Sequence, residues 1–114
     1  MSKTVLTLPD KEPWEIVGYR FDWSKYNVIA DATDTISTVA FAVYADGDNA
    51  ETPTSLTAMI YATDFSASGF WSQCDVGQTA VNDTVGTYIL RARITCTSGR
   101  RYEEQAKFRV KEIG

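Results

Sequence analysis

The sequence predicts an all-β protein, built as a seven-stranded antiparallel β-sandwich. The clearest sign is a pair of long alternating segments, residues 86–97 and 100–111, on either side of a Ser-Gly turn. Apolar and polar residues alternate along both segments with a period of two, which indicates half-buried strands rather than helices. Elsewhere turn residues recur about every ten positions, and no segment has the periodicity of an amphipathic helix. Together these patterns predict two packed antiparallel sheets.

The chain is long enough for one domain with its own core. It has 114 residues, of which 44% are hydrophobic and 23% charged, an ordinary balance for a globular protein. Residues 1–13 are expected to form an N-terminal arm, with a short strand at 4–8 followed by a loop between Pro9 and Pro13. Residues 14–114 are expected to form the sandwich domain.

Strand and turn signals alternate through the first two thirds of that domain. Aromatic residues occupy every second position at Tyr19, Phe21 and Trp23, which predicts a strand with an aromatic face over 15–23. Further strands are expected where β-branched and aromatic residues gather or alternate, at 35–45, 55–62 and 70–76. The connections between them are predicted at 24–34, 46–49, 66–69 and 77–85.

The register of the last hairpin can be deduced from which residues must share a face. A two-residue turn at Ser98-Gly99 would place Leu90 opposite Lys107 and so mix core with solvent. A three-residue loop, 97–99, avoids this conflict and puts Gly99 at the position that favours a left-handed backbone. The predicted cross-strand pairs are Tyr88 with Phe108, Leu90 with Ala106, Ile94 with Tyr102, and Arg93 with Glu103. The same register places Glu104 on the inner face, opposite Ala92.

Charge and the cysteine pair limit the partners and the compartment. The net charge of −4 disfavours binding to nucleic-acid phosphates. Neither a signal peptide nor a membrane-spanning apolar run is recognisable, so a cytoplasmic protein without membrane contact is expected. In that compartment Cys74 and Cys96 are expected to be free thiols.

No residue pattern indicates catalysis, and no enzyme, cofactor or metal is expected. The chain has no histidine, which removes the commonest general base and most zinc sites. The turn at 46–49, with Glu51, has oxygen ligands for calcium but the wrong spacing, so a plain turn is favoured. The carboxylate pairs Asp31/Asp34 and Glu103/Glu104 are better explained as turn and strand-edge residues.

Three aromatic residues are candidates for an interaction surface. Trp14 follows a proline at the end of the arm and is the tryptophan least committed to the core. Phe70 and Trp71 are adjacent, so one of them must point outward if both lie in a strand. Exposed aromatic anchors of this kind serve protein–protein interfaces, and two or more coplanar ones serve sugar stacking.

Several short motifs carry a resemblance to a known family. Gly86-Thr87-Tyr88 resembles the tyrosine corner of immunoglobulin-like domains, although Leu90 stands where antibody domains have a cysteine. More specifically, the order of motifs over about residues 14–111 is similar to that in small immunoglobulin-like tail-associated proteins of tailed bacteriophages, some of which are called fiber-tail adaptor proteins. The motifs are Tyr19-Arg20-Phe21-Asp22-Trp23-Ser24, Asp34-Thr35-Ile36-Ser37, Gly86-Thr87-Tyr88-Ile89-Leu90, Thr95-Cys96-Thr97-Ser98-Gly99-Arg100 and Phe108-Arg109-Val110.

The resemblance implies an immunoglobulin-like sandwich with a structural role. The expected function is that of a non-enzymatic virion protein, made in the bacterial cytoplasm and present in several copies. It would join tail, portal or fiber components through protein–protein contacts. The alternatives are a carbohydrate-binding or adhesin-type module and a capsid decoration domain. The number of exposed tryptophans separates the adaptor from the sugar-binding module.

Overall fold

The computed structural model describes residues 6–24, 34–47, 55–79 and 81–112. Within these ranges the chain forms seven strands and one short 3₁₀ helix, Thr57–Met59, and no helix there is long and apolar enough to span a membrane. The strands are β1 (Leu6–Thr7), β2 (Val17–Asp22), β3 (Ile36–Ala45), β4 (Ile60–Ser66), β5 (Trp71–Val76), β6 (Gly86–Cys96) and β7 (Arg101–Val110). The all-β architecture is therefore confirmed.

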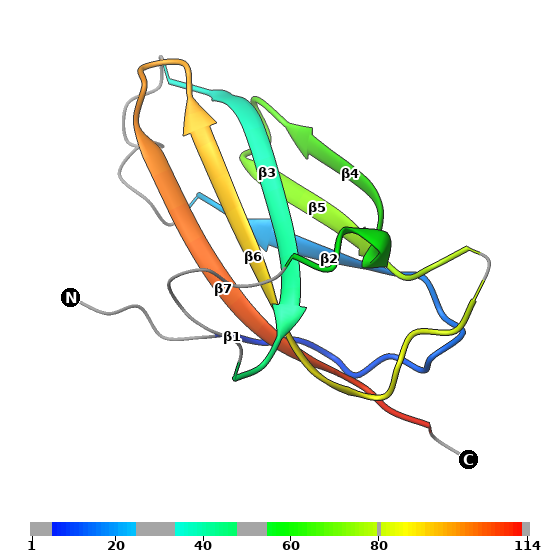
Figure 1. The fold of residues 1–114 in the computed structure, drawn as a ribbon. Coiled ribbons are helices and arrows are strands. Elements are labelled where there is room, and N and C mark those ends of the chain that lie inside the picture. Colours follow the sequence, from blue (N-terminus) through cyan, green and yellow to red (C-terminus); the bar gives the residue numbers. More distant parts are fainter. Residues whose placement is uncertain (1–5, 25–33, 48–54, 80, 113–114) are drawn as a thin grey trace.

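The strands form two sheets that pack face to face (Figure 1). The larger sheet has the order β1-β7-β6-β3 and the smaller one the order β2-β5-β4. All pairs are antiparallel except β1 with β7, which is parallel. A fully antiparallel fold was predicted, and that detail is wrong, because β1 in the arm runs in the same direction as β7.

The β6–β7 hairpin has the predicted register. Tyr88 pairs with Phe108, and Arg93 pairs with Glu103. The loop spans three residues, and its last residue, Gly99, has the expected positive φ of 92°. Its N–H donates to the Cys96 carbonyl at 2.9 Å, which closes the loop. Glu104 is buried on the inner face, as the register requires.

A buried carboxylate fastens this loop to the start of β3. One oxygen of Asp34 accepts hydrogen bonds from the backbone N–H groups of Thr35 and Ser98, and the other accepts one from the Ser98 hydroxyl at 2.7 Å. The hydrogen bond from the Ser98 hydroxyl lowers the pKa of Asp34 most strongly, although burial acts in the opposite direction. Asp34 therefore links the loop between β6 and β7 to the residues that precede β3.

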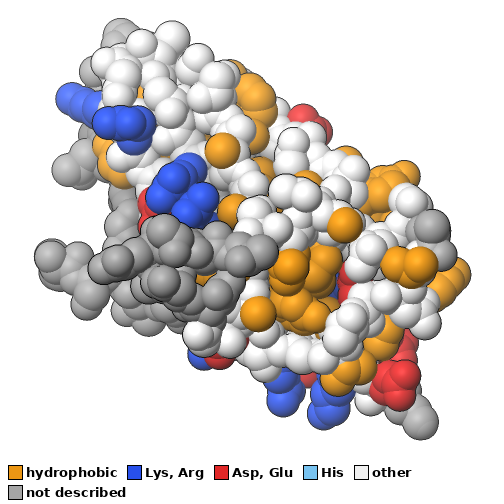
Figure 2. Space-filling view, viewed as in Figure 1, with side chains coloured by type: hydrophobic (Ala, Val, Ile, Leu, Met, Phe, Trp, Pro, Cys, Tyr) orange, Lys and Arg blue, Asp and Glu red, His pale blue; other side chains and the backbone are white. Residues whose placement is uncertain are grey.

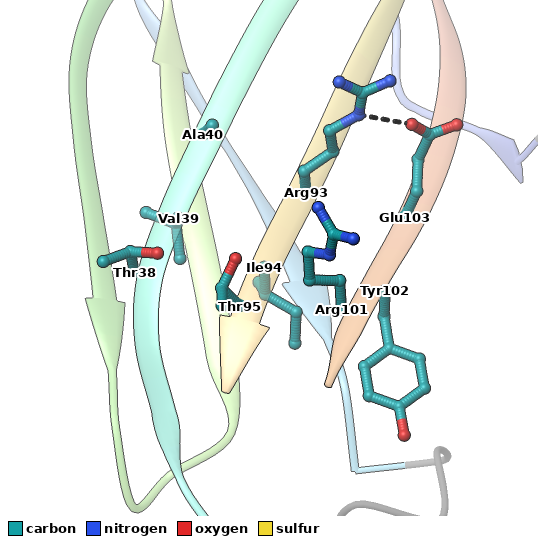
Figure 3. Close-up of a pocket in the computed structure, with 9 residues that line it drawn as sticks. All are labelled: Thr38, Val39, Ala40, Arg93, Ile94, Thr95, Arg101, Tyr102 and Glu103. Atoms are coloured by element: carbon teal, nitrogen blue, oxygen red, sulfur yellow. Dashed lines mark hydrogen bonds and ion pairs between the residues drawn. The ribbon is translucent and has the colours of Figure 1, made fainter. Parts of the chain in front are cut away.

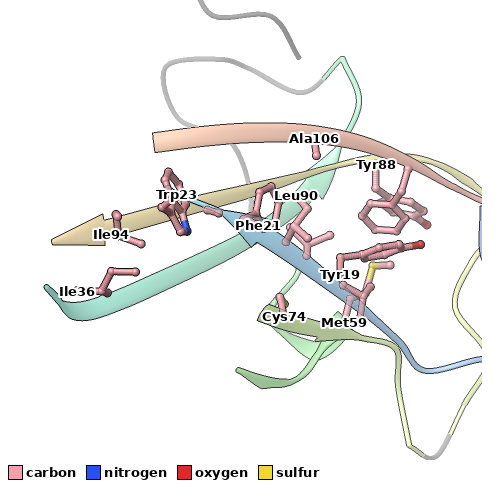
Figure 4. Packing of buried hydrophobic residues seen from close by; sticks show 14 of the residues in the cluster. Tyr19, Phe21, Trp23, Ile36, Met59, Cys74, Tyr88, Leu90, Ile94 and Ala106 are labelled. Atoms are coloured by element: carbon pink, nitrogen blue, oxygen red, sulfur yellow. The ribbon is translucent and has the colours of Figure 1, made fainter. Parts of the chain in front are cut away.

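The core lies between the two sheets (Figure 4). Trp23 is fully buried, and its indole N–H donates to the Ser72 hydroxyl at 2.8 Å. The ring of Phe108 lies 5.4 Å from that of Tyr19 and 5.5 Å from that of Tyr88, so aromatic residues of both sheets meet at the centre. The other large members of the cluster are Phe21, Ile36, Val43, Met59, Val76, Leu90, Ile94 and Val110.

The core also contains a tyrosine hydroxyl with a backbone partner and two thiols. The Tyr88 hydroxyl donates to the Thr84 carbonyl at 2.5 Å, four residues upstream. Cys74 on β5 and Cys96 at the end of β6 are both buried free thiols. Burial, assisted by the charge of Asp75, raises the pKa of Cys74 to about 12, so that residue is an inert part of the core.

The middle of the chain differs from its predicted boundaries. The strand expected over 55–62 begins only at Ile60 and continues to Ser66, because the residues before it form the 3₁₀ helix that turns Met59 into the core. The strand expected from Phe70 begins at Trp71. Most of the predicted connection at 24–34, the second half of the predicted turn at 46–49, Glu51 and the first residues of the arm lie outside the described residues.

Candidate functional site

The arm is held against the sandwich along its described length. The Leu8 N–H donates to the Lys107 carbonyl and the Tyr19 hydroxyl donates to the Pro9 carbonyl, both at 2.8 Å. The guanidinium of Arg109 contacts both carboxylate oxygens of Asp10, at 3.2 and 2.8 Å. The segment before the first long strand is therefore part of the folded surface.

A buried ion pair anchors the next part of the arm. The Lys11 ammonium lies 2.6 Å from a carboxylate oxygen of Asp83, and both side chains are fully buried. Lys11 also donates to the Glu12 carbonyl, and Gln78 donates to the second oxygen of Asp83. Buried charges persist when they are paired and hydrogen-bonded in this way. The pair locks the arm to the loop that precedes β6.

Next to this pair, a tight turn carries Trp14. The Glu12 N–H donates to the Glu15 carboxylate at 2.6 Å, and the Glu15 N–H donates back to the Glu12 carbonyl at 3.1 Å. The Asp83 N–H donates to the Pro13 carbonyl at 2.8 Å, so the turn is also fastened to the opposite loop. The backbone on both sides of Trp14 is thus fixed by hydrogen bonds.

The Trp14 side chain itself points to solvent and is 81% exposed. Two further apolar side chains beside it are also exposed, Ile16 by 42% and Val81 by 60%. With Gln78, Thr79 and Asn82, these three residues line a groove of about 420 Å³. We call this surface the Trp14 groove. Half of its lining residues are apolar and none is charged, and its edges come from two segments that the Lys11–Asp83 pair holds together.

The other two candidate residues occupy a different place. Trp71 lies on the outer face of the smaller sheet and is partly buried, with the guanidinium of Arg20 stacked 3.7 Å from its ring centre. Phe70 precedes the strand, in a turn, with a φ of 58° that is unusual for a bulky residue. Neither side chain is brought near Trp14 by any described contact.

Ile16, Val81, Lys11 and Asp83 were not singled out from the sequence as site residues. The ion pair joins segments far apart in the chain, and neither local pattern distinguishes these charges from solvated ones. The place of Trp14 directly after Pro13 pointed only to the tryptophan itself and not to its neighbours in the groove.

Within the described ranges, no group of three or more His, Cys, Asp or Glu side chains could hold a metal ion. No protein-family model matches this chain, and no curated protein matches it either. The fold and this surface define the chain as a two-sheet β domain with an uncharged groove, around an exposed tryptophan, at the end where the arm meets the domain.

Proposed function

We propose that this chain is a non-enzymatic adaptor that joins components of a tailed-bacteriophage particle through protein–protein contacts. Its Trp14 groove would be a docking surface for a neighbouring structural protein. The proposal includes assembly in the host cytoplasm and several copies in the particle, as the motif resemblance implies.

The strand order supports an immunoglobulin-like topology for this adaptor. In constant-type immunoglobulin domains the B, E and D strands are neighbours in one sheet and the G, F and C strands in the other. Assigning β2 to β7 to strands B to G gives the same two orders here. The hydrogen bond from the Tyr88 hydroxyl to an upstream carbonyl has the geometry of a tyrosine corner.

The exposure of Trp14 is the observation that carries the docking function. Buried tryptophans at the centre of an interface are among the commonest energetic hot spots. A tryptophan held on a rigid turn loses little conformational entropy when it is covered, so its burial adds to affinity. Two neighbouring apolar side chains enlarge the surface that a partner can dehydrate.

Sugar stacking is the weaker alternative. All three tryptophans lie in the described residues, and only Trp14 is exposed. Trp23 is buried in the core, and Trp71 is partly buried with Arg20 stacked on its ring. A platform of two coplanar exposed tryptophans is therefore absent.

Particles assembled with a Trp14→Ala chain test the proposal, and Tyr61→Ala is the matched control. Tyr61 is exposed, by 54%, but lies on β4 outside the groove. We expect Trp14→Ala to lower the affinity for the neighbouring component by about 2 kcal/mol or more, roughly thirtyfold, with loss of tail or fiber attachment. Normal attachment with a folded Trp14→Ala chain, or a glycan affinity that this substitution abolishes, would contradict it.

A further inference from the structure

A second groove lies on the outer face of the larger sheet (Figure 3). Its volume is about 640 Å³, and it crosses β3, β6 and β7. Two cross-strand rows form its floor and sides. The register aligns Thr38, Thr95 and Arg101 in one row, and Ala40, Arg93 and Glu103 in the next. The side chains on β3 are small, whereas Arg93 on β6 and Arg101 and Glu103 on β7 are long. This difference in length leaves a trough above β3.

The charge in this groove is positive, although the chain as a whole is acidic. The Arg93 Nε atom lies 2.5 Å from an oxygen of Glu103, and both side chains remain substantially exposed. Arg101 is exposed and forms no ion pair with any described residue. Among the described residues that line the groove, two arginines therefore face one carboxylate. Figure 2 shows Lys and Arg side chains gathered over this end of the β6–β7 hairpin.

Arginine forks favour a carboxylate-bearing ligand. A guanidinium presents parallel N–H donors that match a carboxylate, and threonine hydroxyls on the floor can donate to further oxygens or to a backbone carbonyl. The overall charge of −4 argues for a short ligand. A long polyanion would extend past the groove over an acidic molecule and be repelled, whereas a short acidic segment would meet only the groove.

We propose that this groove binds an acidic segment of a second protein partner. The inference rests on the proposed adaptor function, to which it adds a second docking surface with different chemistry. The backbone of Lys11, beside the Trp14 groove, pairs with that of Val110, and Val110 lies nine positions from Arg101 along β7. At ~3.3 Å per strand residue, these two ends of β7 are about 30 Å apart. One end of the molecule presents an uncharged groove with an exposed tryptophan, and the other a basic groove.

Fluorescence anisotropy with a short labelled peptide of alternating Glu and Thr tests this proposal directly. A peptide with Gln in place of Glu is the neutral control. At an ionic strength of about 10 mM, where charges interact over about 30 Å, we expect saturable binding of the Glu peptide only. The double variant Arg93→Gln/Arg101→Gln should weaken binding about tenfold or more. Arg20→Gln, on the outer face of the other sheet, should leave it unchanged.

Glu103→Gln gives a result that mere damage to the fold would not give. It removes the carboxylate that occupies Arg93, so the affinity for the Glu peptide should rise. Trp14→Ala should leave this affinity unchanged, which keeps the test separate from that of the Trp14 groove.

Four outcomes would overturn the proposal: no saturable binding of the Glu peptide, weaker binding by Glu103→Gln, equal loss with Arg20→Gln, or tighter Arg101-dependent binding of an oligonucleotide or a sulfated sugar of the same charge.

Discussion

Lys11 and Asp83 are the residues that most directly connect stability with the Trp14 groove. Removing one partner of a fully buried pair leaves an uncompensated charge in the interior. We expect Lys11→Met to lower the free energy of unfolding, measured by urea denaturation, by about 3–5 kcal/mol.

Lys107→Met is the matched control for this change. It breaks the exposed pair between Lys107 and Asp46, at 3.2 Å, and should alter the free energy of unfolding by about 0–1 kcal/mol. The double variant Lys11→Met/Asp83→Leu should recover part of the loss, because it leaves no buried charge behind. Equal losses of unfolding free energy for Lys11→Met and Lys107→Met would show that the buried pair contributes no more to stability than the exposed one.

Gly99 illustrates a constraint that lies in the backbone alone. A Cβ at this position would have no neighbour within 4 Å, so any destabilisation must come from the positive φ. We expect Gly99→Val to destabilise the protein by about 1–3 kcal/mol in urea unfolding. Gly86→Ala is the control, since its added Cβ would make only ordinary contacts, at 3.8 Å and beyond, with Tyr88. Similar stability of the two variants would argue against strain at Gly99.

At the scale of elements, the β6–β7 hairpin depends on Asp34. The pKa of this carboxyl in the folded protein lies below the ordinary value of 3.8, chiefly because of the Ser98 hydroxyl. A lowered pKa contributes stability that is present above 3.8 and is lost as the pH falls through the folded value. Acid should therefore weaken the hairpin.

Urea unfolding of the wild type and of Asp34→Asn across acidic pH measures this contribution. The wild type should be the more stable at neutral pH, and the difference should shrink as the pH falls below 3.8. Asp64→Asn, which removes an exposed carboxylate from β4, should stay close to the wild type. A difference for Asp34→Asn that does not change with pH would contradict this account of the turn.

The hairpin could be predicted because its information is local. Alternation and one glycine sufficed to place Tyr88 opposite Phe108. The start of β4 could not be predicted, because the alternation from Leu56 to Ala62 indicates a strand, whereas the chain forms a 3₁₀ helix there that buries Met59 and leaves Ala58 exposed. The parallel pairing of β1 could not be predicted either, because a strand of two residues carries no sequence pattern that indicates the direction of the strand it pairs with.

At the scale of the whole molecule, the sequence indicated one part of the candidate site and not the rest. Trp14 was recognisable from its place directly after Pro13, at the end of the arm. The groove around it depends on a contact between the arm and the loop before β6, and only the folded chain brings Ile16 and Val81 together. Likewise, the basic groove exists because three strands align small and long side chains in register.

The central claim is that the Trp14 groove meets another protein. Placing a photoactivatable cross-linking side chain at position 14, during particle assembly, tests it most directly. The same group at position 61 is the control, because Tyr61 is exposed but outside the groove. We predict cross-links from position 14 to one neighbouring structural protein, and few from position 61. The absence of cross-links from position 14, or equal cross-linking from both positions, would contradict the claim.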